Sequence, residues 1–168
     1  MPRVKAVTAA LMVATLLPGV GEGQTRPAPG ETPILKRRLS NGLNVWLIEH
    51  HDVPIVQISL VVPHGTGDDP PGKYGVASLV AGMLTEGAGS RTASDIADAV
   101  DRFKGNLAPT DGIDSSSVQL HVTAEGLSAA PPVFADVVMR PTFPEDALQR
   151  VKQERLRVLR QAHGDPHP

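Results

Sequence analysis

Histidines are the residues of this sequence most able to bind a metal ion, because a neutral imidazole nitrogen is a common ligand. The six are His50, His51, His64, His121, His163 and His167. The first two are adjacent at a strand end, where successive side chains point to opposite faces, so they cannot easily bind one ion together. The last two are four residues apart, but Gly164 and Pro166 break helical geometry between them. We favour solvated histidines, with a metal site built from them as the alternative.

Two aspartates and three serines are the other groups whose pattern could do chemistry. Asp68 and Asp69 lie in a loop rich in glycine and proline, without the further ligands that a Ca²⁺ loop requires. We interpret them as turn-forming loop residues. Residues 115–117 are all serine, but none lies in a nucleophile-elbow motif or has an evident histidine partner. A polar strand start is the favoured interpretation.

The stretch GKYGVASLVAGMLTEGA, residues 72–88, follows that loop and predicts an amphipathic helix from about Val76 to Glu86. It contains no histidine and no cysteine, and Glu86 is its only acid. Its apolar face comprises Val76, Leu79, Val80, Met83 and Leu84. The helix is therefore suited to packing and carries no chemistry of its own.

Composition and charge fit one ordinary globular domain. The chain has 168 residues, of which 40% are hydrophobic and 20% charged, and its formal net charge is −2. No cluster of Lys and Arg stands out, so nucleic-acid binding is not expected. Aromatic residues make up 3% of the chain, so the core must be aliphatic.

The first 23 residues have the order of a secretory signal. Arg3 and Lys5 precede an apolar run over residues 6–17, and small residues follow, with a cut expected near Gly23. The run is too short to span a bilayer comfortably, so no stable span is expected, and a short anchor is the alternative. The chain has no cysteine, hence no disulfide. We expect a secreted or periplasmic protein.

The sequence after this signal begins with a lead-in and then predicts strands. Residues 24–33 are rich in proline and predict a flexible segment. Asn41-Gly42 marks a turn between two short strands, and residues 54–62 predict a longer, more buried strand. Residues 106–123 predict two further strands around a turn at Asp111-Gly112.

Helices fill the rest of the chain. After the helix at residues 76–86, a capping box at Thr92 opens a second helix that ends at Gly105. A third begins at Pro131, and a long charged helix follows over residues 144–162. The order β-β-β-α-α-β-β-α-α indicates an α+β fold, with an antiparallel sheet and helices packed on one face.

These segments, in this order, resemble the N-terminal part of the insulinase/pitrilysin family of zinc metallopeptidases. Residues 39–62, LSNGLNVWLIEHHDVPIVQISLVV, resemble the opening hairpin and third strand of that family. Residues 65–110 resemble its signature region, and residues 134–159, FADVVMRPTFPEDALQRVKQERLRVL, its later helix pair. The resemblance implies a metallopeptidase-type half domain over residues 34–168. This half domain is shorter than in the family, so we expect it to be incomplete and truncated at its C-terminus.

Active members of the family carry the motif His-x-x-Glu-His on the helix of residues 72–88. The resemblance places Ser78 at the first His, Ala81 at the Glu and Gly82 at the second His. The third ligand, a Glu seven residues after another Glu, corresponds to Gln161 when counted from Glu154. None of the four positions keeps its chemistry. We therefore expect no catalytic residue and no metal in this chain, with zinc carried by an active partner.

Residues 106–110, NLAPT, resemble the family's edge strand, which pairs with an extended substrate peptide. Strand addition uses backbone groups, so it can survive the loss of a metal site. The resemblance assigns this role to Asn106, Leu107, Ala108 and Thr110, while Pro109 removes one donor. An ordinary edge strand is the equally weighted alternative.

The resemblance predicts a non-catalytic subunit that contributes peptide-binding surface beside a zinc-bearing peptidase subunit of the same family. This chain alone is predicted to be inactive, and its expected partners are that subunit and extended peptides. One alternative is a fragment of a longer zinc metalloendopeptidase whose active site lies outside this chain. The other is a structural interaction module that binds no peptide.

Overall fold

The computed structural model describes residues 33–164. The chain divides into two compact units, Met1–Val53 and Pro54–Pro168. The expected signal, residues 1–23, and nearly all of the lead-in lie outside the described residues. Among the described helices, none is long and apolar enough to cross a membrane.

The first unit contains an antiparallel hairpin of β1 (Ile34–Arg38) and β2 (Asn44–Ile48). The turn between them requires a left-handed backbone at Gly42, with φ of 89°, which only glycine adopts freely. The Asn41 side chain accepts a hydrogen bond from the Leu43 N–H at 3.1 Å. The turn predicted from Asn-Gly is therefore confirmed.

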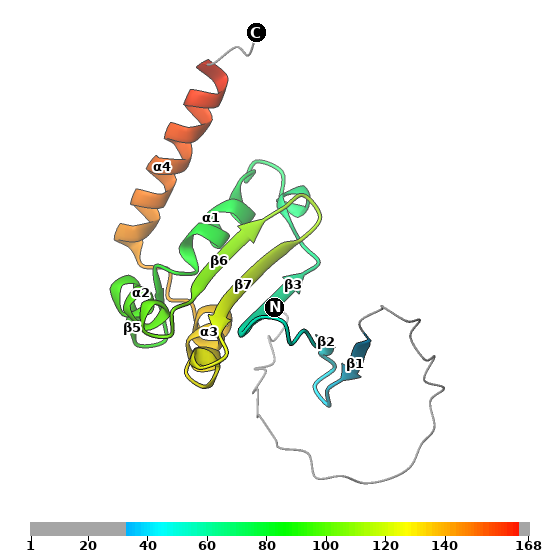
Figure 1. Cartoon of the computed structure of the whole chain (residues 1–168). Helices are drawn as coiled ribbons and strands as arrows, with labels where there is room; N and C mark the ends of the chain where they lie inside the picture. The colour runs from blue at the N-terminus through cyan, green and yellow to red at the C-terminus, as the bar shows by residue number, and fades with distance from the viewer. Residues whose placement is uncertain (1–32, 165–168) are drawn as a thin grey trace. The chain divides into compact units, whose positions relative to one another are not determined.

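The second unit is built on a three-stranded antiparallel sheet (Figure 1). Its strands are β3 (Ile55–Val62), β6 (Asn106–Asp111) and β7 (Ser116–Thr123), in the order β3-β7-β6. Strands β6 and β7 form a hairpin, and β3 pairs with the other side of β7. This order makes β6 an edge strand.

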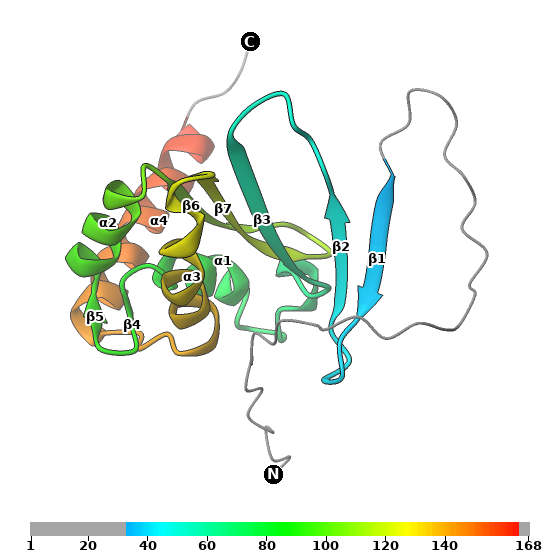
Figure 2. The same cartoon turned by 60° about the horizontal axis from the view of Figure 1, so that its bottom comes forward.

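One face of the sheet is buried under helices (Figures 1 and 2). Val118, Leu120 and Val122 alternate along β7 and are all buried, as the period of two in a strand requires. Leu120 lies opposite Ile58 on β3 and Leu107 on β6. The buried core is aliphatic apart from one aromatic ring and comprises Ala88, Ile96, Ala99, Phe103, Leu120, Val122, Ala130, Val133 and Val137. The predicted α+β fold is confirmed.

Two helices, α2 (Ala93–Arg102) and α3 (Ala130–Met139), contribute Ile96, Ala99, Ala130, Val133 and Val137 to this core. The predicted capping box of α2 is present. The Asp95 N–H donates to the Thr92 hydroxyl at 3.2 Å, and the Thr92 N–H donates to the Asp95 carboxylate at 2.9 Å. Helix α3 begins one residue before Pro131, so that proline falls in its first turn as expected.

Helix α1 (Val76–Met83) ends three residues before Glu86, where the sequence predicted its end. The chain instead forms a tight hairpin of β4 (Gly87–Ala88) and β5 (Arg91–Thr92), which the sequence analysis missed. Its turn uses Gly89 in a left-handed conformation, with φ of 61°. Closely spaced glycines were the available signal for this break.

The long charged helix α4 (Glu145–Gly164) extends two residues beyond its predicted end at residue 162. Two short 3₁₀ turns complete the described chain, η1 (Thr66–Asp68) before α1 and η2 (Gly126–Ser128) before α3. The predicted order of major elements is confirmed, with these turns and the two-residue strands β4 and β5 added.

Candidate functional site

Helix α1 carries three of the positions expected in the motif frame, Ser78, Ala81 and Gly82. Ser78 and Gly82 are four residues apart, so they lie on one side of the helix. Ser78 and Ala81 are both buried. The helix contacts β6 and α4, so side chains of these two elements surround the frame.

Ser78 belongs to a polar cluster with Asp111, the last residue of β6, and Arg155 of α4. The Ser78 hydroxyl donates to the Asp111 carboxylate, and the Arg155 guanidinium donates to the same hydroxyl oxygen at 3.0 Å. Arg155 Nη2 and Asp111 Oδ2 are 4.0 Å apart, beyond hydrogen-bond length. One hydroxyl therefore links two opposite charges and ties α1, β6 and α4 together.

Neither partner of Ser78 is predicted by the local sequence pattern. The pattern predicts Asp111 only as a turn residue, and Arg155 is one of several charges on a long helix. They lie 33 and 77 residues from Ser78 along the chain, which no local periodicity can connect. The available signal was a hydroxyl on a mostly apolar helix, because a buried hydroxyl must find a polar partner.

Gly82, the position of the expected second ligand, faces Val151 of α4. A Cβ atom built on Gly82 would lie 3.0 Å from Val151 Cγ1, closer than nearly all real contacts of this kind. The absence of a side chain at this position lets α1 and α4 approach closely. An imidazole here would have to push Val151 aside.

Gln161, the expected third position, is not brought to this frame. It lies near the end of α4, where its amide oxygen accepts from Arg157 at 3.3 Å. Arg155 is the α4 residue that reaches Ser78, and six residues of helix turn a side chain by about 240°. Arg157 also pairs with Glu154, and this hydrogen bond lowers the pKa of the Glu154 carboxyl. Gln161 thus belongs to a solvent-exposed face.

Strand β6 has one backbone edge free within the described residues. The Gly112 N–H donates to Ser115 O at 2.8 Å, so the backbone of Gly112 points toward β7. Since this direction alternates along a strand, the backbone groups of Leu107, Pro109 and Asp111 point away from β7. Pro109 has no N–H to offer, as expected for proline at an edge.

The free edge refines the expected set of peptide-binding residues. Among Asn106, Leu107, Ala108 and Thr110, only Leu107 turns its backbone groups outward. Thr110 instead shares a hydroxyl contact of 2.8 Å with Ser117 on β7. The outward donors are therefore the N–H groups of Leu107 and Asp111, and the outward acceptors are the carbonyls of Leu107, Pro109 and Asp111.

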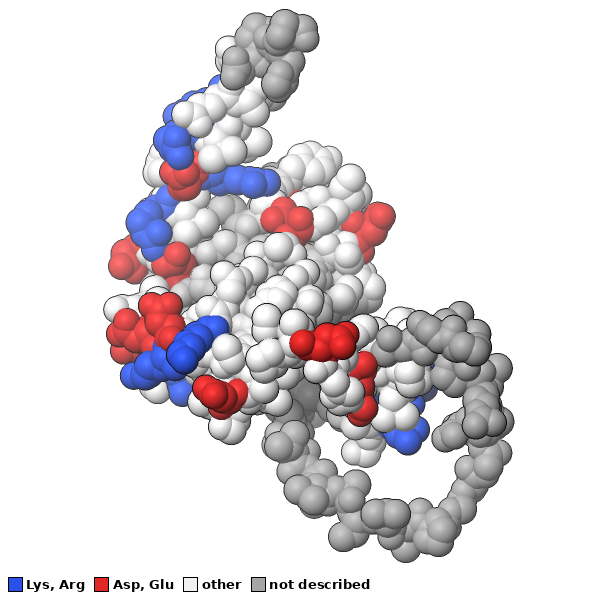
Figure 3. Space-filling model, viewed as in Figure 1, with Lys and Arg blue, Asp and Glu red and all other residues white. Residues whose placement is uncertain are grey.

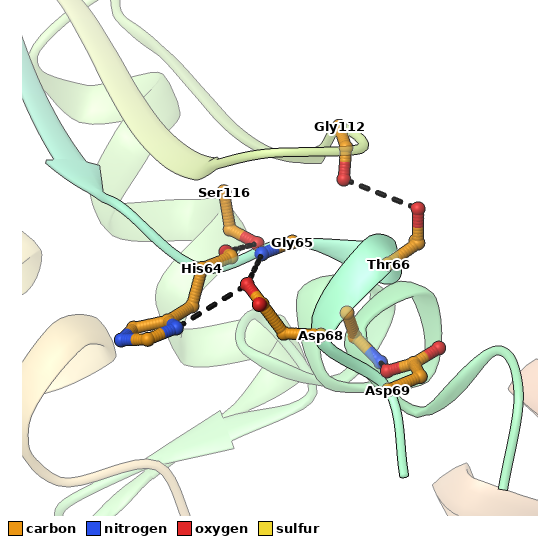
Figure 4. Close-up of polar contacts among 8 residues, drawn as sticks. His64, Gly65, Thr66, Asp68, Asp69, Gly112 and Ser116 are labelled. Carbon is orange, nitrogen blue, oxygen red and sulfur yellow. Dashed lines mark hydrogen bonds and ion pairs between the residues drawn. The ribbon is translucent and has the colours of Figure 1, made fainter. Parts of the chain in front are cut away.

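The loop before α1 is bonded to the β6–β7 turn (Figure 4). The Thr66 hydroxyl donates to Gly112 O at 3.3 Å, and the Ser116 hydroxyl donates to His64 O at 2.9 Å. Gly65 must be glycine, because a Cβ there would lie 2.3 Å from Gly112 O. This loop therefore fixes the turn that follows Asp111.

Both aspartates of this loop are explained by its backbone. Asp68 accepts from the Gly65 N–H at 3.1 Å and contacts the His64 ring at 3.3 Å (Figure 4). Asp69 accepts from the N–H groups of Gly75 and Ala77, at 2.6 and 3.0 Å, where α1 begins. They are loop and helix-start residues, as interpreted from the sequence.

An apolar cavity of about 490 Å³ lies beside Ala81, between α1 and the strands β3 and β7. Its apolar lining includes Leu60, Val62, Val76, Val80, Leu84, Val118 and Val138. Its polar side consists of loop and strand-end residues, including His64, Asp68 and Asp69. Both carboxylates accept hydrogen bonds from backbone N–H groups, which fix the loop and the start of α1, and the surface that the cavity offers is mainly apolar.

Sequence comparison identifies the family. Residues 44–165 match the model of the insulinase family, peptidase family M16. The chain belongs to this family. A protein of Rickettsia bellii named an uncharacterized zinc protease is 27% identical over 129 residues, covering 77% of this chain and 31% of the relative. The chain thus spans about a third of the length of the curated relatives it matches.

Two solved structures share the fold of this chain. A crystal structure of a peptidase M16 inactive domain from Pseudomonas fluorescens matches with a TM-score of 0.74 and 25% identity, over 79% of this chain and 32% of that chain. The crystal structure of pitrilysin matches with a TM-score of 0.67 and 22% identity, over 77% of this chain and 14% of pitrilysin, which shows a shared fold.

The zinc ion implied by the insulinase family does not fit the residues at this frame. Ser78, at the position expected for the first ligand, is a hydroxyl that donates to a carboxylate, and Gly82, at the position expected for the second, has no side chain and packs on Val151. The Arg155 guanidinium at Ser78 adds a positive charge that repels a metal cation. In the described part of the chain, no group of three or more His, Cys, Asp or Glu could hold a metal ion.

Four other candidates, His50, His51, Ser116 and Ser117, have ordinary surroundings, whereas His167 and the side chain of His163 lie outside the described part of the chain. His50 and His51 are exposed, and His51 lies 3.7 Å from the Glu49 carboxylate. Ser116 and Ser117 donate to a backbone carbonyl and contact a threonine hydroxyl, respectively, and neither hydroxyl bonds to a histidine ring. These contacts fit solvated histidines and a polar strand start.

Proposed function

We propose that this chain is a non-catalytic part of an insulinase-family assembly that helps to bind peptides. The observation that carries this proposal is the Ser78–Asp111–Arg155 cluster, which fills the motif frame with a hydroxyl, a carboxylate and a guanidinium. With these groups at the frame, no zinc would be held there to activate a water. In this proposal zinc is carried by a partner subunit of the same family.

Peptide binding would use the free edge of β6. An extended peptide can pair with the outward N–H groups of Leu107 and Asp111 and with the carbonyls between them. Strand addition of this kind needs no metal, so the edge can retain its role although the motif is absent. The match to a peptidase M16 inactive domain supports a family member without catalysis.

The proposal also places the protein outside the cytoplasm, as a secreted or periplasmic subunit. This part rests on the order of charged, apolar and small residues in the first 23 positions. The absence of cysteine means that folding there needs no disulfide.

A second candidate function is a fragment of a longer zinc metalloendopeptidase. It is favoured by the length of the curated relatives, which are named zinc proteases and of which this chain covers about 31%. A His-x-x-Glu-His motif encoded downstream of residue 168 would support this candidate. Its absence would support the partner-subunit proposal.

Two measurements on the purified chain test the proposal. Elemental analysis after dialysis against trace zinc should find no bound zinc, and about one zinc per chain would overturn the non-catalytic assignment. Hydrogen exchange should show that an extended peptide protects the Leu107 and Asp111 amides. Unchanged exchange at saturating peptide, with tight binding to a folded partner, would favour a structural module instead.

A further inference from the structure

We infer that Arg155 recognises a carboxylate on the peptide that pairs with β6. This inference rests on the proposed strand addition and assigns to it a class of ligand, peptides that carry a carboxylate near the Asp111 end of the edge. The carboxylate can belong to an acidic side chain or to a peptide C-terminus.

The position of Arg155 relative to the edge is the first argument. Figure 1 shows β6 on the side of the sheet nearest to α4, so a peptide added to β6 lies on the side from which α4 projects. Arg155 reaches from α4 to Ser78 and approaches the carboxylate of Asp111, whose own N–H points outward from the edge. The guanidinium therefore lies at the end of the peptide track.

The unused donors of Arg155 are the second argument. A guanidinium has five N–H groups in a planar fork that fits a carboxylate. The cluster uses one donor, from Nη2 to the Ser78 hydroxyl, and the Asp111 carboxylate is too distant at 4.0 Å for a hydrogen bond. The Arg155 side chain keeps 48% of its surface exposed, so a ligand can reach the remaining donors.

The surroundings of Arg155 are the third argument. Basic side chains follow the exposed part of α4 (Figure 3), and Lys152 lies one turn before Arg155 on the same side. Val158 and Leu159, one turn after it, are exposed apolar residues. Asp111 opposes an incoming carboxylate, but it already accepts the Ser78 hydroxyl and is only 25% exposed. This face suits a carboxylate with an apolar neighbour.

Three matched peptides test the inference on the full chain. The first is a blocked eight-residue peptide of valine and threonine with one central glutamate. The second replaces the glutamate with glutamine, and the third keeps the glutamine but has a free C-terminal carboxylate. Affinity is measured by fluorescence anisotropy, and hydrogen exchange at Leu107 and Asp111 reports whether each peptide pairs with β6.

We expect the peptides with a carboxylate to bind about tenfold more tightly than the neutral peptide, since charge-assisted hydrogen bonds are the stronger class. The first and third peptides distinguish an acidic side chain from a C-terminus. Arg155→Gln should remove the preference while β6 protection persists, and Arg155→Lys should keep part of it. Arg157→Gln, two residues along α4 and paired with Glu154, is the control that should change nothing.

Two results would overturn the inference in different ways. If all peptides protect β6 equally in the wild-type chain and in Arg155→Gln, edge binding stands and Arg155 has no part in it. If no peptide protects β6, the proposed strand addition fails and the inference fails with it. A loss of folding in Arg155→Gln is detected by circular dichroism, and the glutamate–glutamine comparison on the wild-type chain still decides the ligand class.

Discussion

Gly82 of α1 and Val151 of α4 lie so close that a Cβ on the glycine would be 3.0 Å from the Val151 methyl carbon Cγ1. The resemblance to the family puts Gly82 at the position expected for a metal-binding histidine. At this position the lack of a side chain allows two helices to pack closely. Because Gly82 has no side chain, it offers no metal ligand, and for the same reason α4 can approach α1 closely.

The first prediction concerns this contact. Gly82→His should lower the free energy of unfolding by about 1–2 kcal/mol, because an added side chain in a closely packed contact costs more than the gain in helix propensity. Urea unfolding followed by circular dichroism measures the change. Val151→Ala in the same background should recover most of it. Equal stability of Gly82→His and the wild-type chain would contradict close packing here.

The second prediction concerns the hydroxyl that links Asp111 and Arg155. Ser78→Ala should destabilise the fold by about 1–2 kcal/mol, because the partly buried Asp111 carboxylate loses its donor. A double-mutant cycle with Asp111→Ala isolates the interaction, and its coupling energy should be at least about 0.5 kcal/mol. Strict additivity of the two substitutions would show that the hydrogen bond contributes nothing.

Local patterns in the sequence predicted most of the fold. The Asn-Gly turn, the capping box of α2 and the proline at the start of α3 each depend on residues within a few positions of one another, and each is present. The hairpin of β4 and β5 was missed, because an apolar helical pattern continued through residue 84 and concealed the break after Met83.

The candidate site could be predicted only in part. The resemblance to the insulinase family places Ser78, Ala81 and Gly82 at the motif positions, and none of these residue types is a usual zinc ligand. It cannot show that Arg155 and Asp111 meet at Ser78, since these contacts depend on the packing of α4 and β6 against α1. Gln161, assigned by counting from Glu154, lies on another side of α4.

The third prediction concerns a buried carboxylate on α3. Asp136 is 4% exposed and accepts hydrogen bonds from Arg91 and Arg140, which joins the β4–β5 hairpin to α3. Asp136→Asn should lower the free energy of unfolding by about 1–2 kcal/mol, because a buried carboxylate that accepts from two arginines is lost, while the Arg91 and Arg140 side chains keep access to water, at 33% and 66% exposed. Thermal and urea unfolding both measure this loss.

A surface pair provides the control for that experiment. Glu154→Gln removes an exposed partner of Arg157 and should leave the unfolding midpoint unchanged within error, since exposed ion pairs contribute little. Equal losses in the two variants would mean that burial of Asp136 does not strengthen its interactions.

The fourth prediction concerns the pH dependence of the α2 capping box. Hydrogen bonds from the Thr92 backbone and hydroxyl lower the pKa of the Asp95 carboxyl below its ordinary value. Because the pKa of this carboxyl is lower in the folded state, the carboxylate stabilises the fold at pH values above its unfolded pKa of about 4. This contribution disappears as the pH falls through the lower pKa of the folded state. Carboxyl NMR titration should therefore give Asp95 a pKa below the ordinary value of an aspartate in an unstructured peptide.

Thr92→Ala separates the two causes of this shift. It removes the hydroxyl but keeps the backbone N–H, so the pKa of Asp95 should rise only part of the way toward its ordinary value. In Asp95→Asn, the free energy of unfolding should fall less than in the wild-type chain as the pH drops below about 4, because the titrating carboxyl is gone. If Asp95 titrates at the ordinary pKa of an aspartate in the wild-type chain, the capping box does not form in solution, and the start of α2 must depend on packing alone.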